Sequence, residues 1–292
     1  MAVSRGRIER EGDVVATIGT FDGVHVGHRR LIDETRRQAA ATGRGSVAIT
    51  FDRHPMTIVR PDAVPRLLTG LDHKLELLRA RGVAVDVLEF DATRAAQSAE
   101  DFVESVLVGR LGVRALVVGS TFRFGHRHRG NVALLQSMGA RLGFSVTPID
   151  LVTDDEERTV ISSSFIRSLV EQARLAEARR LLGRDHEVRG QAVDAKHGLV
   201  AVPAELVVPP PGDYTASWSA RRLATAGTAR VGEDRPGDVT VIELSGGGNA
   251  TGDGASAGLV DGERIAVRFV APVASAREPD SSRPTSRSRG HR

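Results

Sequence analysis

The chain has 292 residues, enough for about two domains, and a formal net charge of only +3 at pH 7. It contains no cysteine, which excludes disulfide bonds, thiolate metal sites and cysteine nucleophiles. The first residues are polar and lack the apolar core of a leader peptide, and no apolar stretch approaches the ~20 residues of a membrane span. We therefore expect a cytoplasmic protein with no membrane partner.

The charge is unevenly distributed. Residues 275–292 carry five arginines against Glu278 and Asp280, a charge of +3, so the rest of the chain sums to zero. A neutral body with a Ser/Arg/Pro-rich tail is unlike the continuous basic surface of a nucleic-acid-binding protein, although the isoelectric point is about 10.0. We expect no nucleic-acid partner and a disordered basic tail over 275–292. Nothing in the sequence indicates the oligomeric state.

The first two thirds of the chain alternate between two hydrophobic patterns. Short apolar runs predict strands at 14–18, 46–51, 83–90, 113–118 and 144–151, and amphipathic patterns between them predict helices at 28–42, 71–81, 98–111 and 131–142. Ser98 and Asp101 form a capping box, and Gly112 ends the helix that follows. This alternation predicts an α/β fold with a doubly wound, Rossmann-like parallel sheet.

A glycine-rich turn joins the first strand to the first helix. Gly19 and Gly23 allow the chain to turn, and Gly27 keeps side-chain bulk away from the space between His25 and His28. The free amides and the dipole of a helix start attract phosphate. Two histidines three residues apart could instead bind zinc, but no third ligand is evident. The turn therefore predicts a phosphate-binding site.

A second predicted helix start lies near residue 163, on a helical stretch that runs to about residue 182. Ser163 or Ser164 is the expected N-cap. The hydroxyls of Ser162, Ser163 and Ser164, with Arg167 one turn later, are suited to a second anion site facing the first. The alternative is that the serines only cap the helix.

Two loops that follow predicted strands are rich in aromatic side chains. Because the carboxyl ends of parallel strands share one sheet edge, both loops are expected beside the glycine-rich turn. Stacking and cation–π contacts there would suit a planar ligand, whereas the alternative is that these are core aromatics. The residues are Phe51, His54 and Pro55 in one loop and Phe122, Arg123 and Phe124 in the other.

The pattern changes after residue 183. Short β-like runs at 187–193, 199–208, 214–218, 239–244 and 264–270 predict a small antiparallel barrel. The connection at 219–238 and the glycine-rich stretch at 246–258 interrupt them. The latter lacks the Gly-Lys-Ser/Thr of a phosphate loop and is interpreted as a flexible insertion.

The order of these motifs resembles the bacterial FAD synthetases, which join a riboflavin kinase to an FMN adenylyltransferase of the His-x-Gly-His nucleotidylyltransferase superfamily. The resemblance covers residues 14–184. After Gly-Thr-Phe-Asp-Gly-Val-His-Val-Gly-His it continues through Thr-Phe-Asp-Arg-His-Pro at 50–55, Arg-Leu-Leu-Thr at 66–69 with Lys74, Ser-Ala-Glu-Asp-Phe-Val at 98–103, Val-Val-Gly-Ser-Thr-Phe-Arg-Phe-Gly at 117–125, Ile-Ser-Ser-Ser-Phe-Ile-Arg at 161–167 and Ala-Arg-Arg-Leu-Leu-Gly-Arg at 178–184.

The resemblance implies an adenylyltransferase domain over 1–185 and a kinase-like barrel over 186–274. The implied reaction transfers AMP from ATP to FMN, with FAD and pyrophosphate as products. The implied catalytic residues are His25, His28 and Arg167. ATP-binding is implied for Gly19, Thr20, Phe21, Asp22, Gly23, Gly27, Ser162, Ser163 and Ser164, and flavin-binding for the two aromatic loops. Mg²⁺ is expected to be held mainly by the ATP phosphates, without a protein metal site.

The chain departs from the family in several places. Arg53 stands where the family usually has proline, Thr121 where it has Asp or Asn, and Asn131 where it often has Asp. The barrel region lacks the kinase sequence Pro-Thr-Ala-Asn, whose nearest remnant is Pro203-Ala204-Glu205; Glu243 is a candidate kinase base without a metal loop.

These departures predict an FAD synthase that has lost riboflavin kinase activity. The competing hypotheses are a bifunctional enzyme, a non-catalytic paralogue that binds flavin or nucleotide, and a nucleotidyltransferase for another phosphorylated acceptor.

Overall fold

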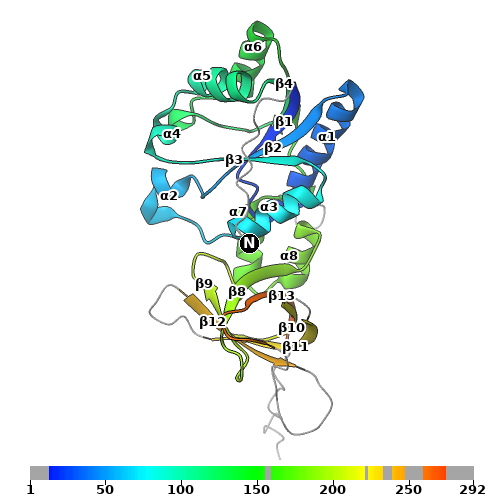
Figure 1. Ribbon diagram of the computed structural model, residues 1–292, viewed down its shortest axis with the longest axis vertical. Coiled ribbons are helices and arrows are strands. Elements are labelled where there is room, and N and C mark those ends of the chain that lie inside the picture. Colours follow the sequence, from blue (N-terminus) through cyan, green and yellow to red (C-terminus); the bar gives the residue numbers. More distant parts are fainter. Residues whose placement is uncertain (1–12, 155–158, 221–222, 233–238, 247–258, 274–292) are drawn as a thin grey trace, which may run out of the picture.

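The computed structural model describes residues 13–154, 159–220, 223–232, 239–246 and 259–273, and within them an α/β unit and a β-barrel stacked end to end (Figure 1). The predicted tail at 275–292 and nearly all of the predicted insertion at 246–258 lie outside the described residues. In the part of the chain that the structure describes, no helix combines the length and apolar character needed to cross a membrane.

The α/β unit is built on a five-stranded parallel sheet, as predicted. Its strands follow the spatial order β3-β2-β1-β4-β5, so the direction of winding reverses between β1 and β4, where ligands bind in such sheets. The bounds are β1 Val14–Ile18, β2 Gly45–Phe51, β3 Ala84–Leu88, β4 Val113–Gly119 and β5 Ser145–Ile149.

Both faces of the sheet are covered. Val14, Ala16 and Ile18 of β1 join the core on the side of α5 and α6, whereas Val15 joins the core that includes Ala39 of α1. All five residues of β1 are buried, which explains their continuous apolar run. The helices are α1 Val26–Thr42, α2 Met56–Val59, α3 Leu71–Ala80, α4 Ala92–Ala96, α5 Ala99–Phe102, the π-helical η3 Val103–Arg110 and α6 Val132–Leu142, with single turns η1 Asp22–Val24, η2 Pro61–Ala63 and η4 His126–His128.

The helical stretch predicted at 163–182 is two helices, α7 Ser163–Glu171 and α8 Leu175–Leu182. Ala173 between them has a left-handed φ of 57°, which breaks the helix. The N-cap of α7 is Ser162, whose hydroxyl accepts a 3.2 Å hydrogen bond from the Phe165 amide. The prediction of Ser163 or Ser164 as the cap is therefore wrong, because the extended backbone of a cap is found at Ser162. A short hairpin, β6 Thr153–Asp154 and β7 Thr159–Val160, precedes α7.

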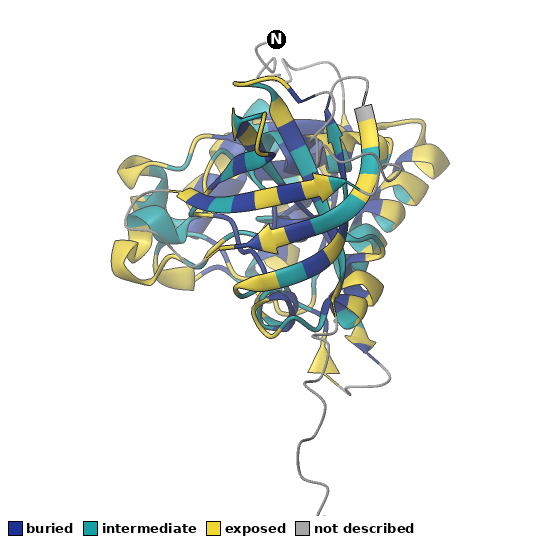
Figure 2. Cartoon of the chain, turned by 90° about the horizontal axis from the view of Figure 1, so that it is seen from below, coloured by how far each residue is buried: buried dark blue, intermediate teal, exposed yellow. Residues whose placement is uncertain are grey.

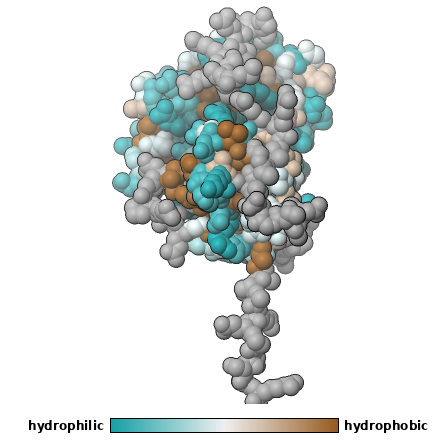
Figure 3. Space-filling model, turned by 60° about the horizontal axis from the view of Figure 1, so that its bottom comes forward, coloured by the Kyte–Doolittle hydropathy of each residue, from teal (hydrophilic) through white to brown (hydrophobic). Residues whose placement is uncertain are grey.

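The second unit is a closed antiparallel barrel of six strands in the order β10-β11-β12-β9-β8-β13. The bounds are β8 His186–Asp194, β9 Leu199–Pro203, β10 Gly212–Ala220, β11 Leu223–Val231, β12 Val239–Gly246 and β13 Arg264–Pro272. Buried and exposed residues alternate along several of these strands (Figure 2), as a filled barrel requires. The end of the barrel that faces the viewer in Figure 3 mixes hydrophilic and hydrophobic residues.

Strand β11 is absent from the elements that the sequence predicts, because its region has the pattern of a connection made of small residues. The barrel requires them: a Cβ on Gly227 would lie 2.9 Å from the ring of Trp218 and 2.2 Å from the Ser245 carbonyl oxygen. Trp218 is 1% exposed and fills the interior. The glycine at position 227 therefore reflects the bulk of Trp218 and the close approach of β12.

The two units are joined through a short segment of backbone and through helix α3. The Leu67 amide donates to the Glu205 carbonyl oxygen (2.6 Å), and the Val207 amide donates to the Leu67 carbonyl oxygen (2.9 Å). Helix α3 adds two ion pairs with the barrel, Asp72–Arg264 (3.1 Å) and Glu76–Arg189 (2.7 Å), and the imidazole of His73 lies 3.4 Å from the Glu187 carboxylate. A cavity of about 970 Å³ lies between α3 and the barrel.

Gly190 of β8 provides a test of the barrel. In Gly190→Ala the new Cβ would lie 2.4 Å from the Ala201 carbonyl oxygen and 2.8 Å from a methyl group of Val200. Backbone on β9 cannot retreat easily, so we expect a loss of about 3 kcal/mol in the free energy of unfolding. The matched control is Gly232→Ala, whose Cβ would meet its nearest atom at 3.5 Å. Urea unfolding of both variants measures the difference, and equal losses would contradict the barrel packing.

Candidate functional site

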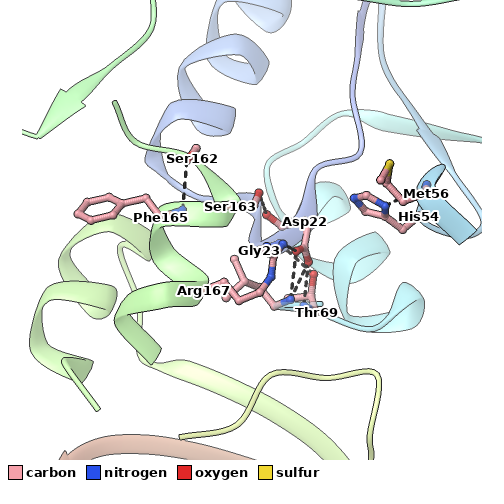
Figure 4. Close-up of polar contacts among 10 residues, drawn as sticks. Asp22, Gly23, His54, Met56, Thr69, Ser162, Ser163, Phe165 and Arg167 are labelled. Atoms are coloured by element: carbon pink, nitrogen blue, oxygen red, sulfur yellow. Dashed lines mark hydrogen bonds and ion pairs between the residues drawn. The ribbon is translucent and has the colours of Figure 1, made fainter. Parts of the chain in front are cut away.

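The predicted site elements meet at one edge of the sheet. The turn after β1, the loop after β2 and the loop after β4 leave adjacent strand ends, as predicted. The N-terminus of α7 faces the first of these turns (Figure 4), and the Ser163 hydroxyl donates a 2.9 Å hydrogen bond to the Asp22 carbonyl oxygen. The two predicted anion-binding segments are therefore in direct contact.

The carboxylate of Asp22 is 4% exposed and holds the turn in place. It accepts hydrogen bonds from the Leu68 amide (2.9 Å), the Thr69 amide (3.1 Å) and the Arg167 guanidinium (3.3 Å; Figure 4). The Gly23 amide donates to the Thr69 hydroxyl (3.1 Å). Asp22 is among the predicted ATP-binding residues, but its carboxylate oxygens are engaged by the protein, which favours a supporting role.

The backbone of the turn is unusual at three residues. Phe21, Gly23 and Val24 have left-handed φ angles of 51°, 78° and 41°. This conformation is costly for a β-branched residue and is tolerated where the surroundings enforce it, which is typical of functional sites. Gly19 does not share it, and a Cβ there would meet only ordinary contacts at 3.5 Å, so the turn does not require glycine at that position. Thr20 is fixed through its carbonyl oxygen, which accepts from Thr50.

The imidazoles of His25 and His28 stack on each other, with ring centroids 3.6 Å apart. Nδ1 of His25 accepts from the His28 amide (3.4 Å) and thereby caps α1, so the proton of neutral His25 is on Nε2. A Cβ on Gly27 would lie 3.2 Å from the His25 ring, which explains the glycine between the two. The rings of Phe21 and His28 pack in a T-shaped arrangement, with their centroids 5.2 Å apart.

Both histidines are neutral at pH 7. Burial lowers the pKa of His25 to about 4, and the positive charges of Arg184 and Arg29 add to the effect. Burial also holds the pKa of His28 well below its usual value, with smaller contributions from His25 and Lys74. Each ring therefore has one N–H donor. Nδ1 of His28 is buried and has no hydrogen-bond partner among the described residues.

Two more cations face this turn. Lys74 donates a 2.9 Å hydrogen bond to the Phe51 carbonyl oxygen, and burial lowers its pKa to about 8 against the opposing effect of Asp22 and Asp52. Nε of Arg167 is buried without a partner among the described residues. Lys74 is among the sequence motifs, but the motifs give it no role. Its place on the first turn of α3 is the signal from which a role in the site could have been predicted.

The three serines at the start of α7 have different environments. Ser162 caps the helix and Ser163 donates to the turn after β1, whereas Ser164 is exposed. The capping hypothesis is thus confirmed for Ser162. The amides of the first turn of α7 have no acceptor within the helix, as at any helix start, and such amides favour an anion.

The predicted flavin residues lie in two groups beside the turn. Phe51 packs edge-on against Phe90 (5.3 Å). Phe122 and Phe124 stack at 5.6 Å, with Phe124 buried in the core and Phe122 partly exposed. Arg123 is exposed, Pro55 precedes α2, and Nδ1 of His54 accepts from the Met56 amide (3.2 Å; Figure 4). The core interpretation therefore holds for Phe124, while Phe122 and His54 border the sheet edge.

The described residues contain no group of three or more acidic, histidine or cysteine side chains arranged to hold a metal ion. Asp22 is already saturated by protein donors. Glu243, the candidate kinase base, is exposed on the barrel surface and lies 4.0 Å from Arg230. The site is thus a cationic turn at the switch point of a doubly wound sheet, with helix starts on both sides.

That arrangement defines an α/β protein with a cluster of cationic and imidazole side chains at the strand ends of its parallel sheet. Residues 7–165, more than half of the chain, match the family model described as FAD synthetase. The chain therefore belongs to the FAD synthetase family, as its motifs indicated.

Relatives in several bacteria are named bifunctional riboflavin kinase/FMN adenylyltransferase. The protein of Escherichia coli K12 is 36% identical over 180 residues, which are 61% of this chain and 57% of the relative. That of Haemophilus influenzae is 34% identical over 178 residues, with the same shares of the two chains. The match thus spans little more than half the length of these relatives.

A solved structure, described as a macrolide-efflux protein from Streptococcus pneumoniae, has the same fold. The TM-score is 0.75 at 21% identity, over 94% of this chain and 90% of the other. The likeness therefore extends over the sheet and the barrel together.

The buried histidines predict a stability that depends on pH. Burial lowers the pKa values of His25, His73 and His186 to about 4, from 6.5. Between these values the unfolded chain binds more protons than the folded one, so stability is full above pH ~6.5 and falls as the pH drops toward ~4, by up to about 1.4 kcal/mol per pH unit for each histidine.

Urea unfolding at about pH 7 and about pH 5 measures this loss. His186→Gln is the matched variant, because the Gln amide can replace the 2.9 Å hydrogen bond to the Val207 carbonyl oxygen without titrating. In this variant the free energy of unfolding should fall less steeply with decreasing pH, because about one proton fewer is taken up on unfolding. A free energy of unfolding that does not change over this range would contradict the neutral, buried state of the histidines.

Proposed function

We propose that this protein is an FAD synthase, which transfers AMP from ATP to FMN and releases pyrophosphate. The observation that carries the proposal is the turn held by Asp22, where two stacked imidazoles, Lys74 and Arg167 converge beside two helix starts. Family membership supports the choice of reaction, and the two aromatic loops at the same sheet edge support a planar acceptor.

The proposed mechanism needs no strong base. The phosphate of FMN, with a second pKa of ~6, is already a nucleophile at neutral pH. The protein would bind and align the two substrates and stabilise the negative charge that develops at the α-phosphorus and on the leaving pyrophosphate. The proposed donors are the Nε2–H of His25, the single N–H of neutral His28 and the guanidinium of Arg167. Backbone amides at the starts of α1 and α7 would add to them.

Mg²⁺ fits this site only as a companion of the substrate. The one carboxylate at the turn, Asp22, is engaged by two amides and a guanidinium. We therefore propose that Mg²⁺ arrives on the ATP phosphates, where it neutralises negative charge. The side chains of the turn would contact the phosphate oxygens that the ion leaves free.

We also propose that the chain has lost riboflavin kinase activity. The Pro-Thr-Ala-Asn sequence is missing from the barrel, and the remnant at Pro203-Ala204-Glu205 ends β9 and bonds to Leu67 of the α/β unit through its backbone. Glu243 has no metal loop opposite it. The FAD synthetase match ends at residue 165, before the first barrel strand.

The first test separates the two reactions. Purified protein with ATP and Mg²⁺ should convert FMN to FAD, whereas riboflavin should remain unchanged. Chromatographic separation of the flavins measures both products. FMN formed from riboflavin at a rate similar to that of FAD would identify a bifunctional enzyme and contradict the proposed loss.

The same assay distinguishes FAD synthesis from two different functions. Consumption of ATP with a phosphorylated acceptor in place of FMN would identify a nucleotidyltransferase with another substrate. Binding of FMN and ATP without any product would identify a non-catalytic paralogue.

His28→Ala should affect catalysis far more than stability. In the proposed mechanism its ring donates to charge that grows in the transition state, so turnover should fall about 10²- to 10³-fold. Arg167→Ala should mainly raise the KM for ATP. FAD formation rates and urea unfolding measure the two effects. Near-normal turnover with a loss of several kcal/mol in stability would show that His28 is only structural.

A further inference from the structure

Arg184 lies between the end of α8 and the start of β8, at the junction of the two units. Its Nη1 atom is 3.4 Å from the Leu182 carbonyl oxygen. The Nη2 atom of Arg29, on the first turns of α1, donates to the same oxygen at 2.6 Å. Two guanidinium groups therefore share one neutral acceptor.

The charge of Arg184 has no carboxylate partner among the described residues. The nearby acidic side chains are engaged elsewhere: Asp22 by two amides and Arg167, Asp185 by Arg179 at 3.2 Å, and Glu187 by groups of α3, β8 and β13. The Nε atom of Arg184 is buried and, within the described part of the chain, unpaired. An unpaired, partly buried cation is unfavourable in isolation. An anionic ligand would provide the missing partner.

Arg184 is also close to the phosphate turn. The Arg29 amide donates to the His25 carbonyl oxygen at 3.0 Å, so Arg29 follows His25 by one turn of α1. The charge of Arg184 acts on the imidazole of His25, and the carboxylates of Glu187 and Asp22 act on Arg184. Burial lowers the pKa of Arg184 only to about 10, so it stays cationic at pH 7. The guanidinium is thus part of the electrostatic surroundings of the proposed site.

We propose that Arg184 is a binding residue for the polyphosphate of ATP and for the pyrophosphate that leaves. The proposal rests on the proposed function. Arg184 and Arg29 form a pair of cations without a bound carboxylate among the described residues, which suits a multiply charged polyphosphate better than a single phosphate. The residue would thereby stabilise the charge that the leaving group gains as its bond to the α-phosphorus breaks.

The alternative role for Arg184 is to cap the C-terminus of α8. That end is already provided for: the left-handed Gly183 donates its amide to the Arg180 carbonyl oxygen, and Arg29 bonds the Leu182 carbonyl oxygen at the shorter distance. The guanidinium of Arg29 packs directly over Gly183, whose left-handed φ of 65° favours glycine. Capping therefore does not require Arg184.

The test is Arg184→Gln in the full chain, with calorimetric titration of pyrophosphate and then of FMN. Loss of a charge-assisted hydrogen bond predicts pyrophosphate affinity lower by about 10- to 100-fold and a similar rise in the KM for ATP. FMN affinity and the thermal midpoint should change little. Arg44→Gln removes an exposed charge just beyond the C-terminal end of α1, leaves the Arg179–Asp185 pair intact, and should change none of these quantities.

Two results would overturn the inference alone. One is an unchanged pyrophosphate affinity in Arg184→Gln. If the thermal midpoint of that variant is also lower, Arg184 is a helix cap. The other is a loss of FMN affinity in place of pyrophosphate affinity. If Arg184→Gln does not fold, Arg184→Lys decides, with an affinity about three- to tenfold lower expected and an unchanged one contradicting the proposal. Unaltered protein that binds neither ATP nor pyrophosphate would overturn the proposed function itself.

Discussion

Two backbone amides and one guanidinium converge on the buried carboxylate of Asp22, and the arrangement of the whole site depends on that convergence. The amides come from the segment that precedes α3, and the guanidinium comes from α7. The carboxylate thus ties two other parts of the chain to the turn, and such surroundings are what allow a left-handed backbone to persist there. The cost of burying one negative charge is offset by three donors, and the turn can then present its histidines in a fixed geometry.

The same segment connects the site to the barrel. Leu67 pairs through its backbone with residues 205 and 207, and the next two residues donate to Asp22. A barrel that lacks the kinase loop is therefore still a neighbour that braces the phosphate turn. Ion pairs from α3 to β8 and β13 strengthen this contact, and the buried imidazole of His73 lies beside the Glu187 carboxylate. This packing gives the barrel, with its core of Trp218 and Phe269, a structural role that does not depend on the Pro-Thr-Ala-Asn sequence.

The electrostatics of the site suit a highly charged anionic ligand. Lys74, Arg167 and Arg184 surround one carboxylate that the protein already uses, while burial keeps both imidazoles neutral. Neutral imidazoles donate a hydrogen bond without adding to the repulsion among these cations. A bound polyphosphate would supply the negative charge that the described residues lack, and would raise the proton affinity of His25 and His28 while it is present.

Local periodicity and the spacing of glycine and histidine are enough to predict the parallel sheet, the turn between its first strand and helix, and the presence of a barrel; that the turn binds phosphate stays a prediction. They also place His25, Gly27 and His28 correctly around the start of α1, since helix geometry fixes residues three apart. Three other features depend on partners distant in the chain. Asp22 faces Leu68 and Arg167, and Phe124 packs in the core near Phe102. Strand β11 forms by pairing with β10 and β12, where Gly227 makes room for Trp218. Arg184 could not be assigned from its own motif, since its position beside Arg29 arises from the packing of α8 against α1.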